Sequence, residues 1–143
     1  MRMSVHVLLL WEDRVLLTLR GPSAAFAPGL WHAGVAGKAE PGEELVAAAL
    51  RESGEELGVT PASDDLSLRH VVHQRSAVGE WEHAFFVSHR WSGVPYNREP
   101  HKHAQIRWWA FGALPGNLVP YCATALARMR SGESFTRLGD TAD

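Results

Sequence analysis

Residues 43–57 form the most clearly helical segment of the sequence, and they constrain the fold more than any other feature. The segment is rich in Glu, Leu and Ala, has acids in its first turn and is followed by Gly58, a pattern typical of a helix with a glycine at its end. Its expected packing side consists of apolar and small residues: Val46, Leu50, Leu57, Ala47 and Gly54. A helix with one apolar side needs another layer of structure to cover that side.

Three glutamates lie on the other side of this helix. Glu52, Glu55 and Glu56 stand at positions i, i+3 and i+4, so their carboxylates share one helical face. Like charges at this spacing cost about a few tenths of a kcal/mol per pair, and the C-terminal end of a helix disfavours anions. Divalent ions such as Mg²⁺ and Mn²⁺ would offset that cost, and they are commonly shared between carboxylates and substrate phosphates. The pattern favours metal-assisted phosphate chemistry; the alternative is a solvated acidic face with Arg51 paired to Glu55.

Six further segments have the apolar or alternating pattern of strands. They are residues 5–11, 14–20, 31–36, 66–74, 81–91 and 105–111. Only two acidic residues separate the first two segments, which predicts a hairpin, and a turn is expected at Val78 and Gly79. A second helix is expected over 121–129, and the polar tail 131–143 is expected to be frayed. This order of elements favours a mixed sheet with a helix on either side.

The length and charge of the chain narrow the classes of partner. Its 143 residues suit one domain, residues 1–143, with one real core. A formal net charge of -2 and a pI near 6.4 give no basic surplus for a nucleic-acid polymer or an anionic membrane. The apolar run 5–11 is too short to cross a membrane and no targeting signal is evident, so a cytoplasmic protein is expected. Cys122 is the single cysteine, so no disulfide can form within the chain.

The spacing of eight residues in and around the helix is the most specific signal. These residues are Gly37, Glu43, Arg51, Glu52, Glu55, Glu56, Gly58 and Val59. They fit the pattern G-x5-E-x7-R-E-U-x-E-E-x-G-U, in which U is apolar, and the sequence therefore resembles the Nudix hydrolases, which carry this signature. Seven of the positions require one residue type. At an average usage of roughly 7% each, chance agreement is about one in 10⁸ per window. The departures are Ser53, where the family usually has an apolar residue, and Ala36, where it often has glycine.

The resemblance implies a fold, a cofactor and a set of metal ligands. The implied fold class is α/β (α+β): a Nudix fold, which is an α/β/α sandwich around a mixed β-sheet. Glu52, Glu55 and Glu56 would hold Mg²⁺ or Mn²⁺, with Glu52 and Glu55 catalytic. Arg51 would belong to the catalytic group by holding a glutamate in place. The resemblance implies two further metal ligands, the Ala36 backbone carbonyl and Glu99. It also implies structural roles for Gly37, Glu43 and Gly58.

The resemblance also implies a substrate class. We favour the MutT-like branch of the family, whose members convert nucleoside triphosphates, oxidised or noncanonical ones included, to a monophosphate and pyrophosphate. Substrate contacts are expected from Arg20, Lys38, Asn117 and Trp31. The expected partner is therefore a small molecule, and the chain is expected to be a monomer or a homodimer. Two alternatives stay open: another diphosphate (a nucleotide sugar, a dinucleotide or a prenyl diphosphate), and a catalytically silent ligand sensor of the same fold. A contribution of His101 and His103 to the site is also left open.

Overall fold

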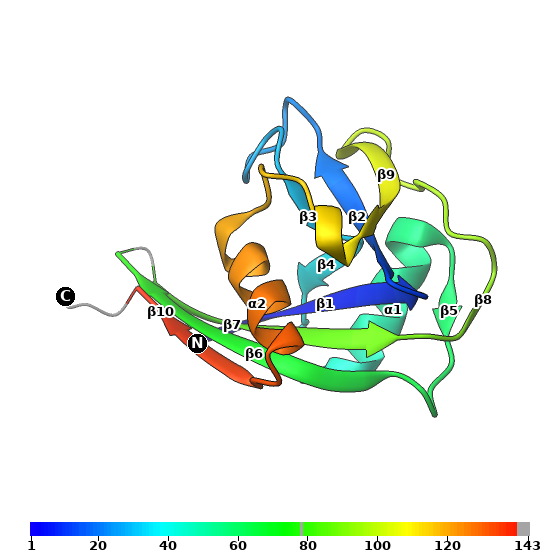
Figure 1. Cartoon of the computed structure of the whole chain (residues 1–143). Coiled ribbons are helices and arrows are strands. Elements are labelled where there is room, and N and C mark those ends of the chain that lie inside the picture. Colours follow the sequence, from blue (N-terminus) through cyan, green and yellow to red (C-terminus); the bar gives the residue numbers. More distant parts are fainter. Residues whose placement is uncertain (78, 140–143) are drawn as a thin grey trace.

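Ten strands and two α-helices make up residues 1–77 and 79–139, the part of the chain described by the structure, which is a computed structural model (Figure 1). Eight strands form one mixed sheet: β1 (Arg2–Trp11), β2 (Arg14–Arg20), β3 (Trp31–Ala33), β4 (Val35–Lys38), β6 (Ser67–Ser76), β7 (Gly79–Ser88), β9 (His103–Ala110) and β10 (Phe135–Leu138). Two short strands form a separate pair, β5 (Thr60–Pro61) and β8 (Trp91–Ser92). The helices are α1 (Leu45–Leu57) and α2 (Pro120–Arg130), and the 3-10 turn η1 (Phe111–Ala113) follows β9. No helix in these described ranges is long and apolar enough to cross a membrane.

Strand β1 organises the sheet through three different neighbours. It forms the predicted hairpin with β2, in which Leu10 pairs with Val15. It also pairs antiparallel with β4 and parallel with β7. β2 pairs antiparallel with β3 and β9, while β6 pairs antiparallel with β7 and parallel with β10. The sheet is therefore mixed, as predicted, and the N-terminal strand lies in its interior.

Alternate residues of the central strands pack into two separate hydrophobic cores. In β1, Val7 and Leu9 belong to the core that α1 covers with Ala48 and Ala49. Leu8, between them, belongs to the core covered by the buried apolar residues of α2. Successive side chains of a strand point to opposite faces of a sheet, so the two helices lie on opposite faces (Figure 1). This arrangement confirms the predicted α/β/α sandwich.

Helix α1 differs from the prediction in its start and in its packing side. It begins at Leu45, because Glu43 lies in the preceding turn, where it interacts with the loop. The buried residues of α1 are Ala48, Ala49, Ser53, Glu56 and Leu57, whereas Val46 is 46% exposed. The expected packing side around Val46 was therefore wrong. The small residues Ala48, Ala49 and Ser53 let the helix approach the sheet closely, and Glu56 lies on this same buried side. Ser53 donates its hydroxyl to the Ala49 carbonyl at 2.7 Å, which satisfies this buried polar group.

Two other segments also differ from the prediction. Segment 31–36 forms two strands instead of one: β3 pairs with β2, and β4 pairs with β1. Gly34 lies between them, and a Cβ at this position would lie only 2.9 Å from the Leu16 carbonyl oxygen. The tail was expected to be frayed, and for β10 this was wrong. Thr136 of β10 is buried and its hydroxyl lies 2.8 Å from His70 Nε2. Residues 140–143 of the predicted tail, and Val78 of the predicted turn, lie outside the described residues.

Candidate active site

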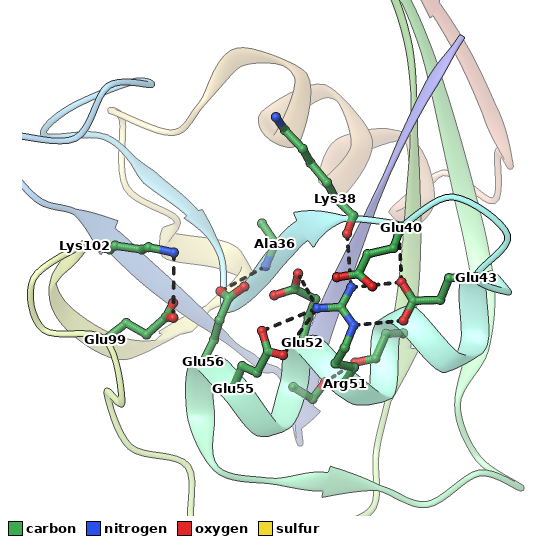
Figure 2. A network of polar contacts seen from close by, with 12 residues as sticks. Ala36, Lys38, Glu40, Glu43, Arg51, Glu52, Glu55, Glu56, Glu99 and Lys102 are labelled. Atoms are coloured by element: carbon green, nitrogen blue, oxygen red, sulfur yellow. Dashed lines mark hydrogen bonds and ion pairs between the residues drawn. The ribbon is translucent and has the colours of Figure 1, made fainter.

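An arginine–glutamate pair ties the loop after β4 to helix α1. Arg51 donates from Nε to Glu43 Oε2 at 2.8 Å and from Nη2 to Glu43 Oε1 at 2.9 Å, the bidentate geometry of a strong pair (Figure 2). The hydrogen bond from Arg51 is the main cause that lowers the pKa of Glu43 to about 2. Arg51 also donates to the Lys38 carbonyl at 3.2 Å, to Glu52 at 3.2 Å and to Glu55 at 3.4 Å. One guanidinium thus positions both the loop and two of the predicted metal ligands.

Two glycines of the signature are required for different reasons. Gly37 lies against the side chain of Glu52, and a Cβ at this position would overlap both carboxylate oxygens, the farther one at 2.6 Å. Gly58 ends α1 in the left-handed region with φ 67° and donates its N–H to Gly54. A Cβ at Gly58 would lie 2.5 Å from the ring of Tyr96. Gly37 permits a close approach, and Gly58 permits the turn.

The three helix glutamates differ in exposure. The Glu55 side chain is 52% exposed, that of Glu52 is 12% exposed, and Glu56 is buried with 5% of its surface exposed. The backbone N–H of Ala36 donates to Glu56 Oε1 at 3.3 Å. Burial and the adjacent Glu52 raise the pKa of Glu56 to about 9. Burial and the neighbouring carboxylate thus disfavour the charged form of Glu56, and a cation at this place would favour it.

The loop between β8 and β9 brings a fourth carboxylate to this place. The backbone N–H of Tyr96 donates to the Leu57 carbonyl at 3.1 Å, and that of Arg98 donates to the Glu56 carbonyl at 3.1 Å. The loop thus satisfies the last carbonyls of α1, which have no partner within the helix. Glu99 follows directly and its side chain lies on the same side as Glu56 (Figure 2).

Glu56, Glu99 and His103 form a compact group of possible ligands. Each offers one ligand atom, and these atoms all lie within 4.8 Å of one another. Glu52 adjoins Glu56, so the set contains several carboxylate oxygens and one imidazole nitrogen. Divalent cations bind such sets, and a cation also accounts for a buried carboxyl placed next to two others. The residues present therefore fit a divalent metal ion.

A pocket of about 490 Å³ adjoins the carboxylates, because Ala36 and Gly37 form part of its wall. Its volume lies in the range of about 300–1,000 Å³ that is usual for small-molecule sites. The wall combines two cationic side chains with five rings: Arg20 and Lys38, and His6, Phe26, Trp81, His83 and Tyr121. This composition suits a ligand with one anionic part and one flat part.

Three of these rings are nearly parallel. The Trp81 and His83 rings are 5.9 Å apart at an interplanar angle of 6°, and the His83 and Tyr121 rings are 3.9 Å apart at 8°. The Ser4 hydroxyl lies 2.6 Å from His83 Nδ1, and His83 Nε2 lies 3.1 Å from Gln74 Oε1. The Gln74 oxygen can only accept, so the network assigns the imidazole proton to Nε2 and makes Nδ1 the acceptor of the serine proton.

Beneath Tyr121, two buried histidines form a continuous hydrogen-bonded chain. The Ala33 N–H donates to His32 Nδ1 at 2.8 Å, and His32 Nε2 donates to the Tyr121 hydroxyl at 2.8 Å. The hydroxyl donates to His6 Nε2 at 2.9 Å, and His6 Nδ1 donates to the Ala84 carbonyl at 3.3 Å. This assignment gives each of the two imidazoles one proton, so both are neutral. Burial accordingly lowers the pKa of His6 well below its usual value and that of His32 to about 3.

The comparison with protein families agrees with the geometry of the site. The NUDIX domain model matches residues 1–129, which include both sides of the sheet, the carboxylates and the pocket. The chain belongs to the NUDIX domain family. It is a Nudix hydrolase, an enzyme that acts on diphosphate bonds in nucleoside derivatives.

Solved structures include several Nudix proteins with the same fold. The MutT NUDIX hydrolase from Burkholderia pseudomallei has a TM-score of 0.80 and 29% sequence identity, over 88% of this chain and 95% of that chain. The MutT protein from Bacillus halodurans has a TM-score of 0.74 and 17% identity, over 96% and 88%. The NUDIX domain of Shewanella oneidensis NrtR, solved with ADP ribose, has a TM-score of 0.70 and 18% identity, over 90% and 86%. A comparison with curated protein sequences finds no significant match.

Two of the predicted substrate residues line the Nudix pocket. Arg20 donates from Nε to the Phe26 carbonyl at 2.5 Å, and its guanidinium lies 5.4 Å from the centre of the Phe26 ring. The Lys38 ammonium lies 5.8 Å from the centre of the Trp81 ring. Figure 2 shows the Lys38 side chain directed away from the carboxylates. Both cations are thus placed beside rings of the pocket.

The other two predicted substrate residues lie elsewhere. Trp31 is 6% exposed, and its ring meets Trp109 edge-on at 5.1 Å. Asn117 donates its side-chain amide to the Gly29 carbonyl at 3.1 Å, which joins two loops. Within residues 1–77 and 79–139, the pocket wall contains neither of them.

The sequence interpretation did not assign several residues that the structure brings to the site. His103 is buried and joins Glu56 and Glu99, whereas His101 is exposed, and only the burial distinguishes the two histidines. Trp81 and His83 both reach the pocket because they alternate along β7. The two-residue spacing could have predicted that these two rings lie on the same face of β7. It could not indicate which face of β7 meets the pocket.

Proposed function

We propose that this Nudix hydrolase converts a nucleoside triphosphate, oxidised or noncanonical ones included, to a nucleoside monophosphate and pyrophosphate. The observation that carries the proposal is the pocket beside the carboxylates, which combines two cations with flat rings. Arg20 and Lys38 suit the negative charge of a polyphosphate, and Trp81 and Phe26 suit stacking on a base. The chain has a net charge of -2, so these local cations must attract the anion rather than the protein as a whole.

The proposed cofactor is Mg²⁺, with Mn²⁺ as a possible replacement. Glu52, Glu55 and Glu56 would hold it, with Glu99 and the backbone carbonyl of Ala36 as further ligands. When bound, the cofactor would supply neutralisation of the charge on the phosphate oxygens. The raised pKa of Glu56 and the proximity of Glu99 support this assignment, because both favour a cation at this place.

The remaining steps belong to side chains of the protein. We assign Glu52 to orient and deprotonate the attacking water, because its carboxylate is held between Gly37 and the Arg51 guanidinium. Arg51 acts as a positioning residue, since its own bonds go to Glu43 and to the two glutamates. Positioning and charge neutralisation account for most of the rate in phosphoryl transfer, which fits a site with no nucleophilic side chain assigned.

Product analysis with a panel of diphosphate compounds tests the proposal. The panel holds dNTPs, oxidised dNTPs, nucleotide sugars, dinucleotides including ADP-ribose, and prenyl diphosphates, each with Mg²⁺. We expect monophosphate plus pyrophosphate from one or more nucleoside triphosphates. Cleavage of another class alone would contradict the proposed substrate while leaving the family assignment intact.

A charge-neutral substitution tests the carboxylates. Glu55→Gln should lower kcat/KM by at least about 100-fold, because an amide is a poor ligand for a hard divalent ion. Glu44→Gln is the matched control, since Glu44 is an exposed glutamate beside the start of the same helix and makes no capping bond with its side chain. Excess EDTA should abolish wild-type turnover, and added Mg²⁺ should restore it. Full turnover in EDTA would contradict the metal assignment.

A further inference from the structure

His103 is the histidine whose ring lies in a compact group with the two carboxylates Glu56 and Glu99. It is 6% exposed, at the first residue of β9, and a nitrogen of its ring lies within 4.8 Å of ligand oxygens of Glu56 and Glu99. In the described part of the chain, no hydrogen bond or ion pair engages this imidazole. The ring nitrogens are therefore available to a ligand that does not belong to the chain.

The backbone holds His103 and Glu99 in one rigid turn. The Glu99 carbonyl accepts the N–H of Lys102 at 2.8 Å and that of His103 at 3.0 Å, which makes a single helical turn. Side chains four residues apart lie on the same side of such a turn. Asn97 fixes both ends: its Oδ1 accepts the Glu99 N–H at 3.1 Å, and its Nδ2 donates to the His103 carbonyl at 2.8 Å. The two side chains are therefore presented together to Glu56.

The dimensions of this group suit a single ion. Bonds of a divalent ion to imidazole nitrogen or carboxylate oxygen are about 2.0–2.2 Å, so two ligand atoms of one ion lie up to about 4.4 Å apart. The atoms of Glu56, Glu99 and His103 lie within 4.8 Å of one another. A small movement of the side chains would close the group around an ion.

We propose that His103 is a metal ligand that joins Glu56 and Glu99, so that one metal position of this enzyme has a nitrogen donor. The inference rests on the proposed metal-dependent function and deepens it, because it changes which ion the position prefers. Mg²⁺ favours oxygen donors alone, whereas imidazole suits transition ions. This position therefore binds Mn²⁺ or Co²⁺ in preference to Mg²⁺.

The experiment uses Mn²⁺ as the probe and reads the metal directly. The full chain is freed of metal with a chelator and then titrated with Mn²⁺, and electron spin echo envelope modulation detects any ¹⁴N bound to the ion. We expect nitrogen modulation in the wild-type protein, its loss in His103→Gln, and its persistence in His101→Gln. His101 is the matched control because it is an exposed histidine of the same turn. His103→Gln should also weaken Mn²⁺ binding at this position by at least about tenfold and change Mg²⁺ binding less, which lowers the Mn²⁺/Mg²⁺ preference.

The outcomes separate this inference from the proposed function. Bound Mn²⁺ without nitrogen modulation in the wild-type protein would overturn the role of His103 and leave the carboxylate site in place. Protein that binds no Mn²⁺ at all would overturn both. The wild-type spectrum decides the matter even if His103→Gln fails to fold, and His103→Asn offers a second variant in that event.

Discussion

Replacing Gly37 with alanine tests whether the function depends on the close approach of Glu52 to β4. Gly37 pairs with Val5 in the sheet, so its backbone cannot retreat without disturbing the β1–β4 register. A new Cβ would lie 2.6 Å from Glu52 Oε1 and closer still to Oε2, whereas ordinary contacts begin at 3.4 Å. The smallest shift is 3.4 − 2.6 = 0.8 Å for the farther oxygen, so the carboxylate must move by about 1 Å or more.

A displacement of this size has a large expected effect on catalysis. Misplacing a positioned group by about 1 Å can cost about 10²-fold in rate, or about 2.7 kcal/mol of transition-state stabilisation. We therefore expect kcat/KM of Gly37→Ala to fall by about 100-fold or more on the triphosphate cleaved best by the wild type. The φ of Gly37 is not in the left-handed region, so the backbone tolerates alanine. The free energy of unfolding should thus change by about 1 kcal/mol or less, as measured by urea titration.

Gly54→Ala is the matched control, because it makes the same glycine-to-alanine change in α1, the helix that carries Glu52. A Cβ at Gly54 would meet nothing within 4 Å. Alanine in place of glycine should stabilise the helix by up to about 1 kcal/mol and leave turnover unchanged. Near-normal kcat/KM in Gly37→Ala would refute the reasoning, since Glu52 would then function without its place against β4.

The remaining predictions concern the arginine pair and the buried histidines. Arg51→Lys should weaken Mg²⁺ binding by about 10–100-fold in calorimetry, because lysine cannot reproduce the bidentate pair with Glu43; unchanged affinity would contradict the positioning role. Burial lowers the pKa of His6 and His32 in the folded protein, so unfolding takes up protons below about pH 6.5, and stability falls as the pH decreases toward 4. Each histidine contributes about 1.4 kcal/mol per pH unit to that slope. His6→Gln should reduce the slope of urea-derived stability against pH by about this amount, and an equal slope would show that His6 is not held neutral.

The sequence predicts the layers of the fold because its periodicities are clear. The alternation in β1 and β2 and the acid-rich helix α1 lead directly to a sheet between helices. The packing side of α1 was misjudged because Val46 outweighs alanine in any hydrophobic pattern, although Ala48 and Ala49 are the residues small enough for close contact with the sheet. β10 was missed because Phe135–Leu138 is short and flanked by polar residues, and only β6 supplies its pairing partner.

The site was predictable to the extent that its residues are local in sequence. Arg51, Glu52, Glu55 and Glu56 share one helix, so their spacing alone indicates a common chemistry. His103 and Trp81 reach the site through the sheet, and no local pattern reports such long-range placement. Trp31 was expected to contact the substrate, but it is 6% exposed and packs on Trp109. The sequence alone does not distinguish an aromatic residue of the core from one that lines a pocket.

The parallel pairing of β1 with β7 also affects how the protein is made. Arg2 pairs with Trp81, so nearly ninety residues must be synthesised before β1 has this neighbour along its full length. Closing so long a loop is slow, and local contacts cannot replace it. Until β7 emerges from the ribosome, the apolar strand β1 presents an unpaired edge on which nascent chains can associate. The long sequence separation of these two strands therefore makes synthesis a stage at which we expect the chain to be prone to aggregation.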